Sequence, residues 1–377
     1  MKLQTLDQAD LTGKTVFYRP DYNVPLDGHR IVDDFRITAT FATLEQFMEA
    51  KCRIIIGTHL GRPDGKPDPA FELRPVAERL AERYPESVVR LAHQLEHKDV
   101  ARSIELMHPG DILMLPNLRF YPGEEANDKK FAQTLATLAE IYVNDAFACD
   151  HRAHASIVGV PALLPAFAGL LLQSEIEHLK LIRKPEHPFV VVMGGAKVSD
   201  KIELIKSLGR HADRILIGGA MANTFLLAEG EEVSDSLVEK DKVSLAKDLM
   251  QMLGDKLLLA ADYVKGDEKD GRYKYLDIGP QAIKEFKDVL KGAKTVFWNG
   301  SLGRTEDAQF AVASEEIARF IAGLKGAHTV IAGGDTVETI TKLGLHDDVS
   351  FVSTGGGAAL EYLAGKELPG IKVLEKN

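Results

Sequence analysis

The sequence contains little cysteine and tryptophan and no long apolar run. Among its 377 residues there are two cysteines, Cys52 and Cys149, and one tryptophan. Two cysteines cannot build a disulfide framework, which is typical of proteins kept in a reducing cytoplasm. No apolar stretch is long enough to cross a bilayer, and the first residues lack the apolar segment of a signal peptide. We therefore expect a cytoplasmic protein with no membrane partner.

Positive charge is also scarce. Lysine and arginine number 46 against 56 aspartate and glutamate, a formal net charge of -10. This balance argues against nucleic acid as a main partner. An anionic small molecule is still compatible with it, because a local basic cluster can oppose the sign of the whole. With 45% hydrophobic and 27% charged residues, the chain has the composition of a globular protein, and its length fits roughly two domains.

Short apolar runs alternate with amphipathic stretches throughout the chain. In the first half the sequence predicts strands at 15–18, 53–57, 88–91, 111–115 and 140–144, and helices at 38–50, 71–84 and 127–139. In the second half it predicts strands at 189–193, 214–217, 256–260, 295–298, 329–332 and 350–352, and helices at 200–208, 221–228, 240–253, 309–322 and 337–343. This alternation predicts an α/β fold with parallel sheets and helices on both faces.

The two halves are joined by a segment with a helical pattern. Leu172, Ile176 and Leu179 fall on one helical face, at i, i+4 and i+7. We interpret 166–184 as an interdomain helix, with a packed surface helix as the alternative. The resulting division is a first domain at 1–165, the helix at 166–184, a second domain at 185–369, and a tail at 370–377 that we expect to pack on the first domain.

Cationic and polar residues follow four predicted strands of the first half. These stretches are Arg19 to Pro25 with Arg36 shortly after, Thr58 to Pro63, Asn117 to Phe120, and Asp145 to His154. Parallel strand ends meet at one edge of a sheet, where ligands bind. Arginine binds carboxylate and phosphate oxygens in pairs, so converging arginines predict a small polyanion as ligand. Taken singly, each arginine is better explained as a solvated surface residue, and the joint pattern carries the prediction.

Two other chemistries find little support in the same region. Cys149, His151 and His154 could supply two zinc ligands, but the sequence shows no second cluster to complete a tetrahedral site. A serine or cysteine hydrolase would need a nucleophile-elbow sequence, which is absent.

The second half is organised around the stretch 189–201. An apolar run without alternation, Phe189 to Met193, indicates a buried strand, and Gly194-Gly195 allows a tight turn. A helix after that turn would direct unpaired N–H groups at it, beside Lys197 and Lys201, so a phosphate is the expected ligand. An ordinary strand-to-helix turn with solvated lysines is an equal alternative. The spacing is not that of a Walker A loop.

Further glycine turns follow the later strands. Gly333-Gly334-Asp335-Thr336 places a carboxylate and a hydroxyl at a helix start, and Ser353 to Gly357 offers backbone N–H groups at another. Hard oxygen ligands of this kind suit Mg²⁺ on nucleotide phosphates. The alternative is that Asp335 or Thr336 caps its helix. Together with the two lysines, these turns favour a nucleoside triphosphate site.

These motifs, taken in order along the chain, resemble the phosphoglycerate kinase family. The matching stretches are 19–25, 58–63, 117–120, 142–154, 194–201, 218–225, 297–303, 333–336 and 353–357. The resemblance implies two Rossmann-like domains separated by a cleft. It also implies reversible phosphoryl transfer between 1,3-bisphosphoglycerate and Mg-ADP, giving 3-phosphoglycerate and Mg-ATP, by a cytoplasmic monomer.

The resemblance also implies roles for the matched residues. The triose would be bound by Asp21, Asn23, Arg36, His59, Arg62, Arg119 and Arg152. The catalytic set would be Arg36 and Lys197, which contact the phosphoryl group in flight, with the backbone N–H groups of Gly334 and Gly357. The nucleotide would be bound by Lys197, Lys201, Glu306, Gly333, Gly334, Asp335 and Thr336, with Asp335 as the ligand of Mg²⁺.

Some positions depart from the usual family pattern. Pro20 replaces a small aliphatic residue, Pro116 replaces a glutamate, and Ala332 replaces a glycine. The stretch Ser301 to Glu306 stands where Pro-x-Gly-x-Phe-Glu is typical, which bears on the nucleoside contact and on Glu306. None of these changes removes a charged group expected at the phosphoryl.

The implied reaction requires no general base from the protein. The attacking group is a carboxylate, ionised at neutral pH because carboxyl pKa values lie near ~4. Alignment and charge neutralisation then suffice, with closure of the two domains to bring donor and acceptor in line.

A dehydrogenase would show Gly-x-Gly-x-x-Gly early in the chain, and none is present. A scaffold protein that had lost catalysis is the other alternative, and it predicts damage at Arg36, Lys197 or Asp335, which all stand.

Overall fold

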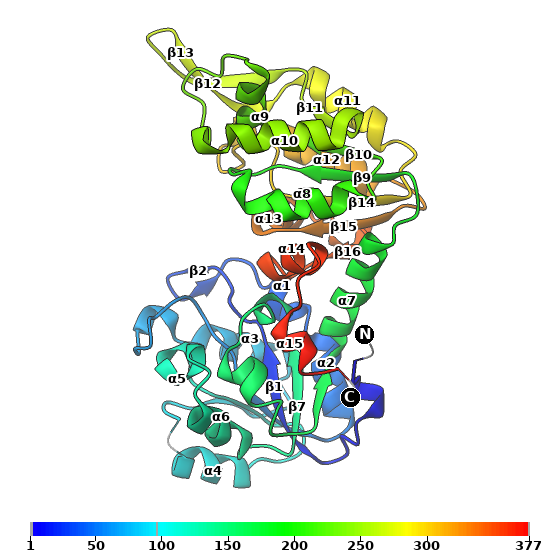
Figure 1. Cartoon of the computed structure of the whole chain (residues 1–377). Coiled ribbons are helices and arrows are strands. Elements are labelled where there is room, and N and C mark those ends of the chain that lie inside the picture. The colour runs from blue at the N-terminus through cyan, green and yellow to red at the C-terminus, as the bar shows by residue number, and fades with distance from the viewer. Residues whose placement is uncertain (1–2, 96, 376–377) are drawn as a thin grey trace. The chain divides into compact units, whose positions relative to one another are not determined.

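The computed structural model describes residues 3–95 and 97–375. The chain divides into two compact units, and each contains one large parallel sheet with helices on both faces (Figure 1). The first unit takes residues up to Ile176 and from Glu367 onward, and the second takes Glu177–Lys366. The predicted α/β class with parallel sheets is confirmed.

The sheet of the first unit has six strands in the order β5-β6-β4-β1-β7-β8, all parallel. Their bounds are β1 Thr15–Pro20, β4 Arg53–Ile56, β5 Val89–Leu91, β6 Ile112–Met114, β7 Ile141–Asp145 and β8 Ala166–Ala168. Every residue of the central strands β1 and β7 is buried. This explains their unbroken apolar runs, because a strand covered by helices on both faces has no solvent side.

The helices of the first unit cover this sheet, and a small antiparallel hairpin lies beside them. The helices are α1 Phe35–Thr38, α2 Phe41–Glu49, α3 Arg74–Arg83, α4 His97–Glu105, α5 Pro122–Glu125, α6 Lys129–Ala136 and the C-terminal α15 Pro369–Lys372, and the hairpin pairs β2 Leu26–Asp27 with β3 Arg30–Ile31. Phe47, Ile54 and Leu80 are among the fully buried side chains of the core between sheet and helices.

The sheet of the second unit has the order β11-β10-β9-β14-β15-β16, again parallel. Its strands are β9 Phe189–Met193, β10 Arg214–Ile217, β11 Leu257–Leu259, β14 Thr295–Asn299, β15 His328–Ala332 and β16 Phe351–Val352. The helices are α8 Ile202–Gly209, α9 Met221–Glu229, α10 Val243–Leu253, α11 Pro280–Leu290, α12 Val312–Ala322, α13 Gly334–Leu343 and α14 Gly357–Leu363. The predicted strands of both halves are therefore confirmed to within about two residues.

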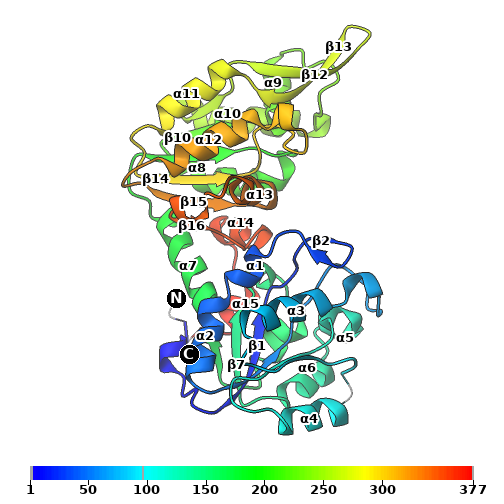
Figure 2. The ribbon, with the colours of Figure 1, turned by 180° about the vertical axis from the view of Figure 1, so that it is seen from behind.

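An antiparallel hairpin, β12 Tyr263–Lys269 and β13 Arg272–Ile278, projects from the second unit (Figure 2). It was not predicted, nor were α4 and α11, whereas the helix start expected after residues 353–357 is present as α14. Helices α11, α12 and α13 pack in one row, and α8 packs with both α10 and α14 in another. The two rows cover opposite faces of the sheet.

The interdomain helix begins later than predicted. Residues 166–168 form the edge strand β8, whose Phe167 pairs with Val143 of β7, and the helix α7 runs over Leu170–Arg183. Gly169 N–H donates to the Asn144 carbonyl at 2.8 Å, which extends this pairing to the turn and delays the helix. The predicted buried face of α7 is confirmed, since Leu172, Ile176 and Leu179 are at most 1% exposed.

The C-terminal segment belongs to the first unit. Gln4 N–H donates to the Leu374 carbonyl at 3.0 Å, and Gly370 N–H donates to the Asp150 carbonyl at 3.0 Å. Gly370 is needed there, because an added Cβ would lie 2.2 Å from an Asp150 carboxylate oxygen. Residues 376 and 377 of the predicted tail lie outside the described residues.

Candidate active site

The carboxyl ends of β6, β4, β1 and β7 lie side by side in the first unit. The segments that follow them carry the side chains predicted to bind an anion. Asp21 and Asn23 follow β1, His59 follows β4, Arg119 lies in a 3-10 turn after β6, and Arg152 follows β7. Sheet topology therefore brings residues more than 100 positions apart to one edge, as the sequence predicted.

Asp21 is the acidic centre of this edge. Arg36, at the end of α1, donates from Nη1 to Asp21 Oδ2, and His59 Nδ1 lies 3.7 Å from Asp21 Oδ1. Burial favours the neutral acid, but Arg36, His59 and Arg19 outweigh it and hold the pKa of Asp21 below its usual range. Burial also lowers the pKa of His59 well below the ordinary value, so its imidazole is neutral near pH 7.

Gly61 connects two other predicted residues. Its N–H donates to Asn23 Oδ1 at 2.8 Å, and its carbonyl accepts from Arg119 Nη1 at 2.8 Å. Asn117 completes the arrangement. Its Oδ1 accepts from Arg119 N–H at 3.1 Å, and its Nδ2 donates to the Leu60 carbonyl at 2.7 Å. Asn23 and Arg119 are thus held by one short loop.

Arg152 and Arg62 are less enclosed. Arg152 is half-buried, and its Nε lies 3.0 Å from His151 Nε2. Arg62 is exposed and directly follows Gly61 in the chain. Both cations therefore border the edge built by Asp21, Asn23 and Arg119.

Arg19, expected at this edge as one of the cations that follow the strands but assigned no individual role, is buried within the site. It is 1% exposed, and its Nε donates to Ser156 Oγ at 2.7 Å. Its Nη2 lies 3.5 Å from His59 Nδ1 and 3.8 Å from Cys149 Sγ. The predicted strand ended at residue 18 and left Arg19 after it, whereas β1 extends to Pro20 and buries the guanidinium, whose hydrogen bond to Ser156 offsets part of the cost of burial.

Cys149 does not lie with the histidines that were considered together with it as zinc ligands. Its Sγ lies with Asp21 and His59, and the three potential ligand atoms are within 4.8 Å of one another. His154 Nδ1 instead lies 3.9 Å from Glu124 Oε1. Because Arg19 and Arg36 place positive charge beside the Asp21 group, these atoms are poorly suited to a cation.

The glycine turn of the second unit differs from the prediction. Gly194 N–H donates to the Asn299 carbonyl at 3.0 Å, and Gly195 N–H donates to the Ser301 carbonyl at 2.7 Å. An added Cβ on Gly194 would lie 2.0 Å from that Ser301 oxygen. These glycines thus allow two chain segments to approach each other. After them Glu239 accepts from Ser199 N–H at 3.0 Å, so this N–H group is directed at a carboxylate of the chain and not at a ligand.

A cavity of about 350 Å³ nevertheless lies over this turn, at the carboxyl ends of β9, β14, β15 and β16. Its lining includes most of the residues predicted for the nucleotide and for catalysis: Lys197, Lys201, Gly333, Gly334, Asp335 and Gly357. Lys197 and Asp335 are exposed. Gly333, at φ 96°, turns the chain into α13, whose first turn contains Asp335. The cavity therefore presents two lysines, the carboxylates of Asp200 and Asp335, and two helix starts to a ligand.

Lys201 differs from a solvated lysine. Its side chain is buried, and Nζ donates to the Asn299 carbonyl at 2.9 Å and to Asn299 Oδ1. Burial lowers the pKa of Lys201 to about 8, against the opposing effect of Asp335 and Asp200. Asn299 was not predicted, although it ends a buried strand directly before a glycine, the position at which the other site residues were found.

The turn after β14 is held from several sides. Thr336, predicted to bind the nucleotide, is buried, and its Oγ1 accepts from Gly300 N–H at 2.6 Å. Asn299 Nδ2 donates to the Ala332 carbonyl at 2.9 Å, and Trp298 Nε1 donates to the Gly300 carbonyl at 2.9 Å. The position of Lys201 is thereby tied to β15 and α13.

Glu306 and its neighbours lie apart from this cavity. Glu306 is exposed, and it is outside the described residues that line the 350 Å³ space. Within the same unusual stretch, Arg304 Nη1 lies 3.0 Å from Asp267 Oδ2 of the hairpin, and its guanidinium lies 5.0 Å from the centre of the Phe310 ring. Arg304 thus connects this loop to β12.

Comparison with known proteins gives a consistent result over the whole chain. The family model described as phosphoglycerate kinase matches residues 6–366. A phosphoglycerate kinase of Pseudothermotoga lettingae is 46% identical over 393 residues, covering 99% of this chain and 98% of that protein. One of Thermus thermophilus is 45% identical over 392 residues, covering 99% of this chain and 100% of that protein.

Solved structures agree. The phosphoglycerate kinase of Coxiella burnetii superposes with a TM-score of 0.84 at 34% identity, and that of Pyrococcus horikoshii with 0.88 at 28% identity; each comparison covers 99% of this chain and 98% of the other. With the family model matched over residues 6–366 and a relative 46% identical across 99% of the chain, this chain belongs to the phosphoglycerate kinase family.

Proposed function

We propose which residues carry out the family's reaction, the reversible transfer of a phosphoryl group between 1,3-bisphosphoglycerate and ADP that yields 3-phosphoglycerate and ATP. The observation that carries this assignment is the family match over residues 6–366. It is supported by the occurrence of an anion-binding edge in one unit and a glycine-lined cationic cavity in the other.

The triose is assigned to the first unit. We propose that Arg62, Arg119 and Arg152 bind its phosphate, because guanidinium groups match phosphate oxygens in pairs. Asp21 and Asn23 are acceptors suited to the hydroxyl group, and Arg36 and His59 complete the set. The ion pair between Arg36 and Asp21 fixes the carboxylate, and it keeps a guanidinium beside the reacting carboxyl group.

The nucleotide is assigned to the cavity of the second unit. Lys197, Lys201, Gly333, Gly334 and Asp335 line this space, and we propose that they bind the phosphates. Thr336 acts by holding Gly300 through its hydroxyl group. Glu306 stays a proposal for the nucleoside end.

The residues present also fit Mg²⁺. The exposed Asp335 carboxylate lies in the first turn of α13, beside the cavity and near enough to Lys201 to affect its pKa. A carboxylate oxygen of this kind is the ligand that Mg²⁺ takes in proteins, together with substrate phosphates and water. We propose Asp335 as this ligand. When bound, the ion neutralises negative charge on the nucleotide phosphates.

Catalysis by the chain's own residues is electrostatic. The attacking or leaving carboxyl group needs no base, because it is ionised at neutral pH. Lys197 and Arg36 supply positive charge to the migrating phosphoryl group, and the N–H groups of Gly334 and Gly357 donate to its oxygens. Because the two sets of residues belong to different units, the reaction requires both to act on one phosphoryl group.

Oligomeric state and location are also proposals. We propose a monomer of the cytoplasm, in line with the low cysteine content. Among the described residues, no helix has the length and apolar character needed to span a bilayer.

The test is ATP formation from 1,3-bisphosphoglycerate and Mg-ADP, followed with a coupled assay. Each substrate should be required, and 3-phosphoglycerate with Mg-ATP should support the reverse reaction. A purified, folded chain that binds both substrates without turnover would contradict the assignment and would favour the scaffold alternative.

A further inference from the structure

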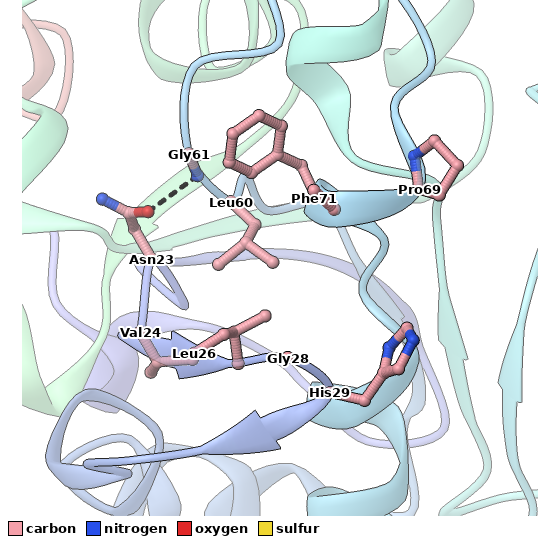
Figure 3. A pocket seen from close by; sticks show the side chains of 10 residues that line it. Asn23, Val24, Leu26, Gly28, His29, Leu60, Gly61, Pro69 and Phe71 are labelled. Carbon is pink, nitrogen blue, oxygen red and sulfur yellow. Dashed lines mark hydrogen bonds between the residues drawn. The ribbon is translucent and has the colours of Figure 1, made fainter.

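The first unit contains a largely apolar cavity that shares Asn23 with the residues assigned to the triose and otherwise lies beside them. It encloses about 500 Å³ between the hairpin β2–β3 and the loop that leads from Leu60 to Phe71. Figure 3 shows Leu26 and His29 of the hairpin on one side and Leu60 and Phe71 of the loop on the other. This volume is within the range of small-molecule sites, which are mostly apolar with few polar groups.

The cavity has a buried end and an open end. Val24 and Leu60, at its inner end, are 4% and 2% exposed. His29, Pro69 and Ala70 line it and are exposed. The lining residues that the structure describes include no carboxylate, lysine or arginine, and His29 supplies the one imidazole. The occupant that fits is an apolar ring system whose single anionic group lies near His29.

The wall of this cavity is also the support of the anion-binding edge. The Phe71 ring lies against Gly61, where an added Cβ would be 2.2 Å from the ring. The N–H and carbonyl of Gly61 are held by Asn23 and Arg119. Asn117 Nδ2 contacts both the Leu60 carbonyl and, at 3.0 Å, the Phe71 carbonyl. A molecule that packs on Leu60 and Phe71 therefore contacts the residues that fix Asn23 and Arg119.

We propose that this cavity is a regulatory site for a small aromatic carboxylate, and that its occupation strengthens triose binding. Such a ligand adds contacts to the arrangement of Leu60, Gly61 and Phe71 that already holds Asn23 and Arg119. A ligand that prefers this arrangement stabilises it, and a triose that prefers it gains by the same factor. The coupling rests on the proposed triose site, whereas binding to the cavity does not.

Binding is tested by isothermal titration calorimetry with 2-naphthoate on the full chain. We expect a Kd on the order of 1 mM or below, as suits a ligand of this size. Ala70→Trp, which fills the cavity from its exposed end, should weaken binding about tenfold or more. Ala81→Trp, at an exposed position of α3 outside the cavity, should leave it unchanged. Equal affinity in the two variants would overturn the site.

The anionic preference has its own test. Wild-type protein should bind 2-naphthoate more tightly than the uncharged 2-naphthalenemethanol, and His29→Ala should remove this difference. A preference that persists in His29→Ala would overturn the proposed orientation.

Coupling is tested by repeating the titration with saturating 3-phosphoglycerate. The affinity for 2-naphthoate should rise about fivefold, near the low end for coupled sites, and 2-naphthoate should lower the Kd for 3-phosphoglycerate by the same factor. Binding of 3-phosphoglycerate is measured first by itself. If it binds and the affinity for 2-naphthoate does not change, the regulatory role is wrong; if it does not bind, the proposed triose site is wrong while the Ala70→Trp result still decides the cavity.

Discussion

Nucleotide binding should weaken as pH rises through about 8, because of Lys201. Burial lowers the pKa of its ammonium to about 8. Below that pH Lys201 is charged and attracts phosphate oxygens; above it the side chain becomes a neutral amine. The second ionisation of the terminal ADP phosphate is nearly complete above pH 7, since such a pKa lies near ~6, so a decline centred near pH 8 arises in the protein.

The expected size follows from the fraction of charged lysine. One unit above a pKa of about 8, roughly one tenth of the side chains are protonated. If only the charged form binds productively, kcat/KM for ADP should fall about tenfold between pH 7 and pH 9, or about 1.4 kcal/mol. Each further pH unit should cost another factor of about ten.

The assay is kcat/KM for Mg-ADP at saturating triose between pH 6.5 and pH 9.5. Lys201→Arg keeps its charge at every pH tested, so it should lose the alkaline decline. Asn299→Asp places a carboxylate at the Oδ1 position that accepts from Lys201 Nζ, and it should move the decline to higher pH. Asp150→Asn is the control, because burial raises the pKa of Asp150 to about 8 in the other unit.

The reasoning would be refuted in one of two ways. An unchanged decline in both Lys201→Arg and Asn299→Asp would show that Lys201 does not control it. A decline that disappears in Asp150→Asn would assign the titration to the triose-binding unit.

Three further predictions concern activity and stability. Lys197→Ala should lower kcat about 10²–10³-fold, the scale for one preorganised donor, whereas Lys206→Ala, at a half-buried position that does not line the cavity, should not; a near-normal kcat of Lys197→Ala in steady-state assays would overturn its role. Arg62→Ala should raise the triose KM at least several-fold with a smaller change in kcat, and Arg90→Ala, exposed on β5, is its control; equal KM values for the two variants would place Arg62 outside the site. Asp150 has a folded pKa of about 8 against about 3.9 in the unfolded chain, so the folded state binds more protons between these values and the stability from this group is lost as pH rises toward 8. Asp150→Asn should therefore raise Tm by several degrees at pH 9 and little at pH 5 in thermal melts; an equal shift at both values would contradict the buried, titrating carboxyl.

The sheets could be predicted because their strands are buried on both faces. Phe189 to Met193 is apolar at every position and every position is buried. Elements at the edge of a sheet were harder to predict, since they need fewer apolar residues. The strand at 166–168 lies at the edge of its sheet, and its small residues allow either a strand or a helix start.

The missed hairpin had a signal in the sequence. Asp270-Gly271 lies between two runs that contain Tyr263, Tyr273 and Tyr275. Both turn residues have positive φ, 52° and 76°, the conformation for which Asp-Gly is favoured in two-residue hairpins. Likewise, Pro280 opens α11 at a position that proline prefers. Turn chemistry would have corrected an assignment made from apolar runs alone.

Within the site, the sequence could indicate which residues gather but not how they are held. The ends of β1, β4, β6 and β7 are adjacent by topology, so Asp21 and His59 could be expected together. That Gly61 joins Asn23 to Arg119 depends on backbone groups that any residue carries, and Asn299 holds Lys201 partly through its backbone carbonyl. Contacts of this kind arise from the folded path of the chain and leave no pattern in composition or spacing.

The single tryptophan makes the second unit optically distinct. Trp298 is fully buried on β14, and its indole N–H donates to the Gly300 carbonyl beside Lys201. Indole emission shifts to the red when the ring meets water, so intrinsic fluorescence monitors this unit alone, while circular dichroism averages both. Denaturant curves followed by the two signals should coincide if the units unfold together and separate if one melts before the other. Trp298 therefore makes it possible to measure, without an added label, whether the two units unfold together.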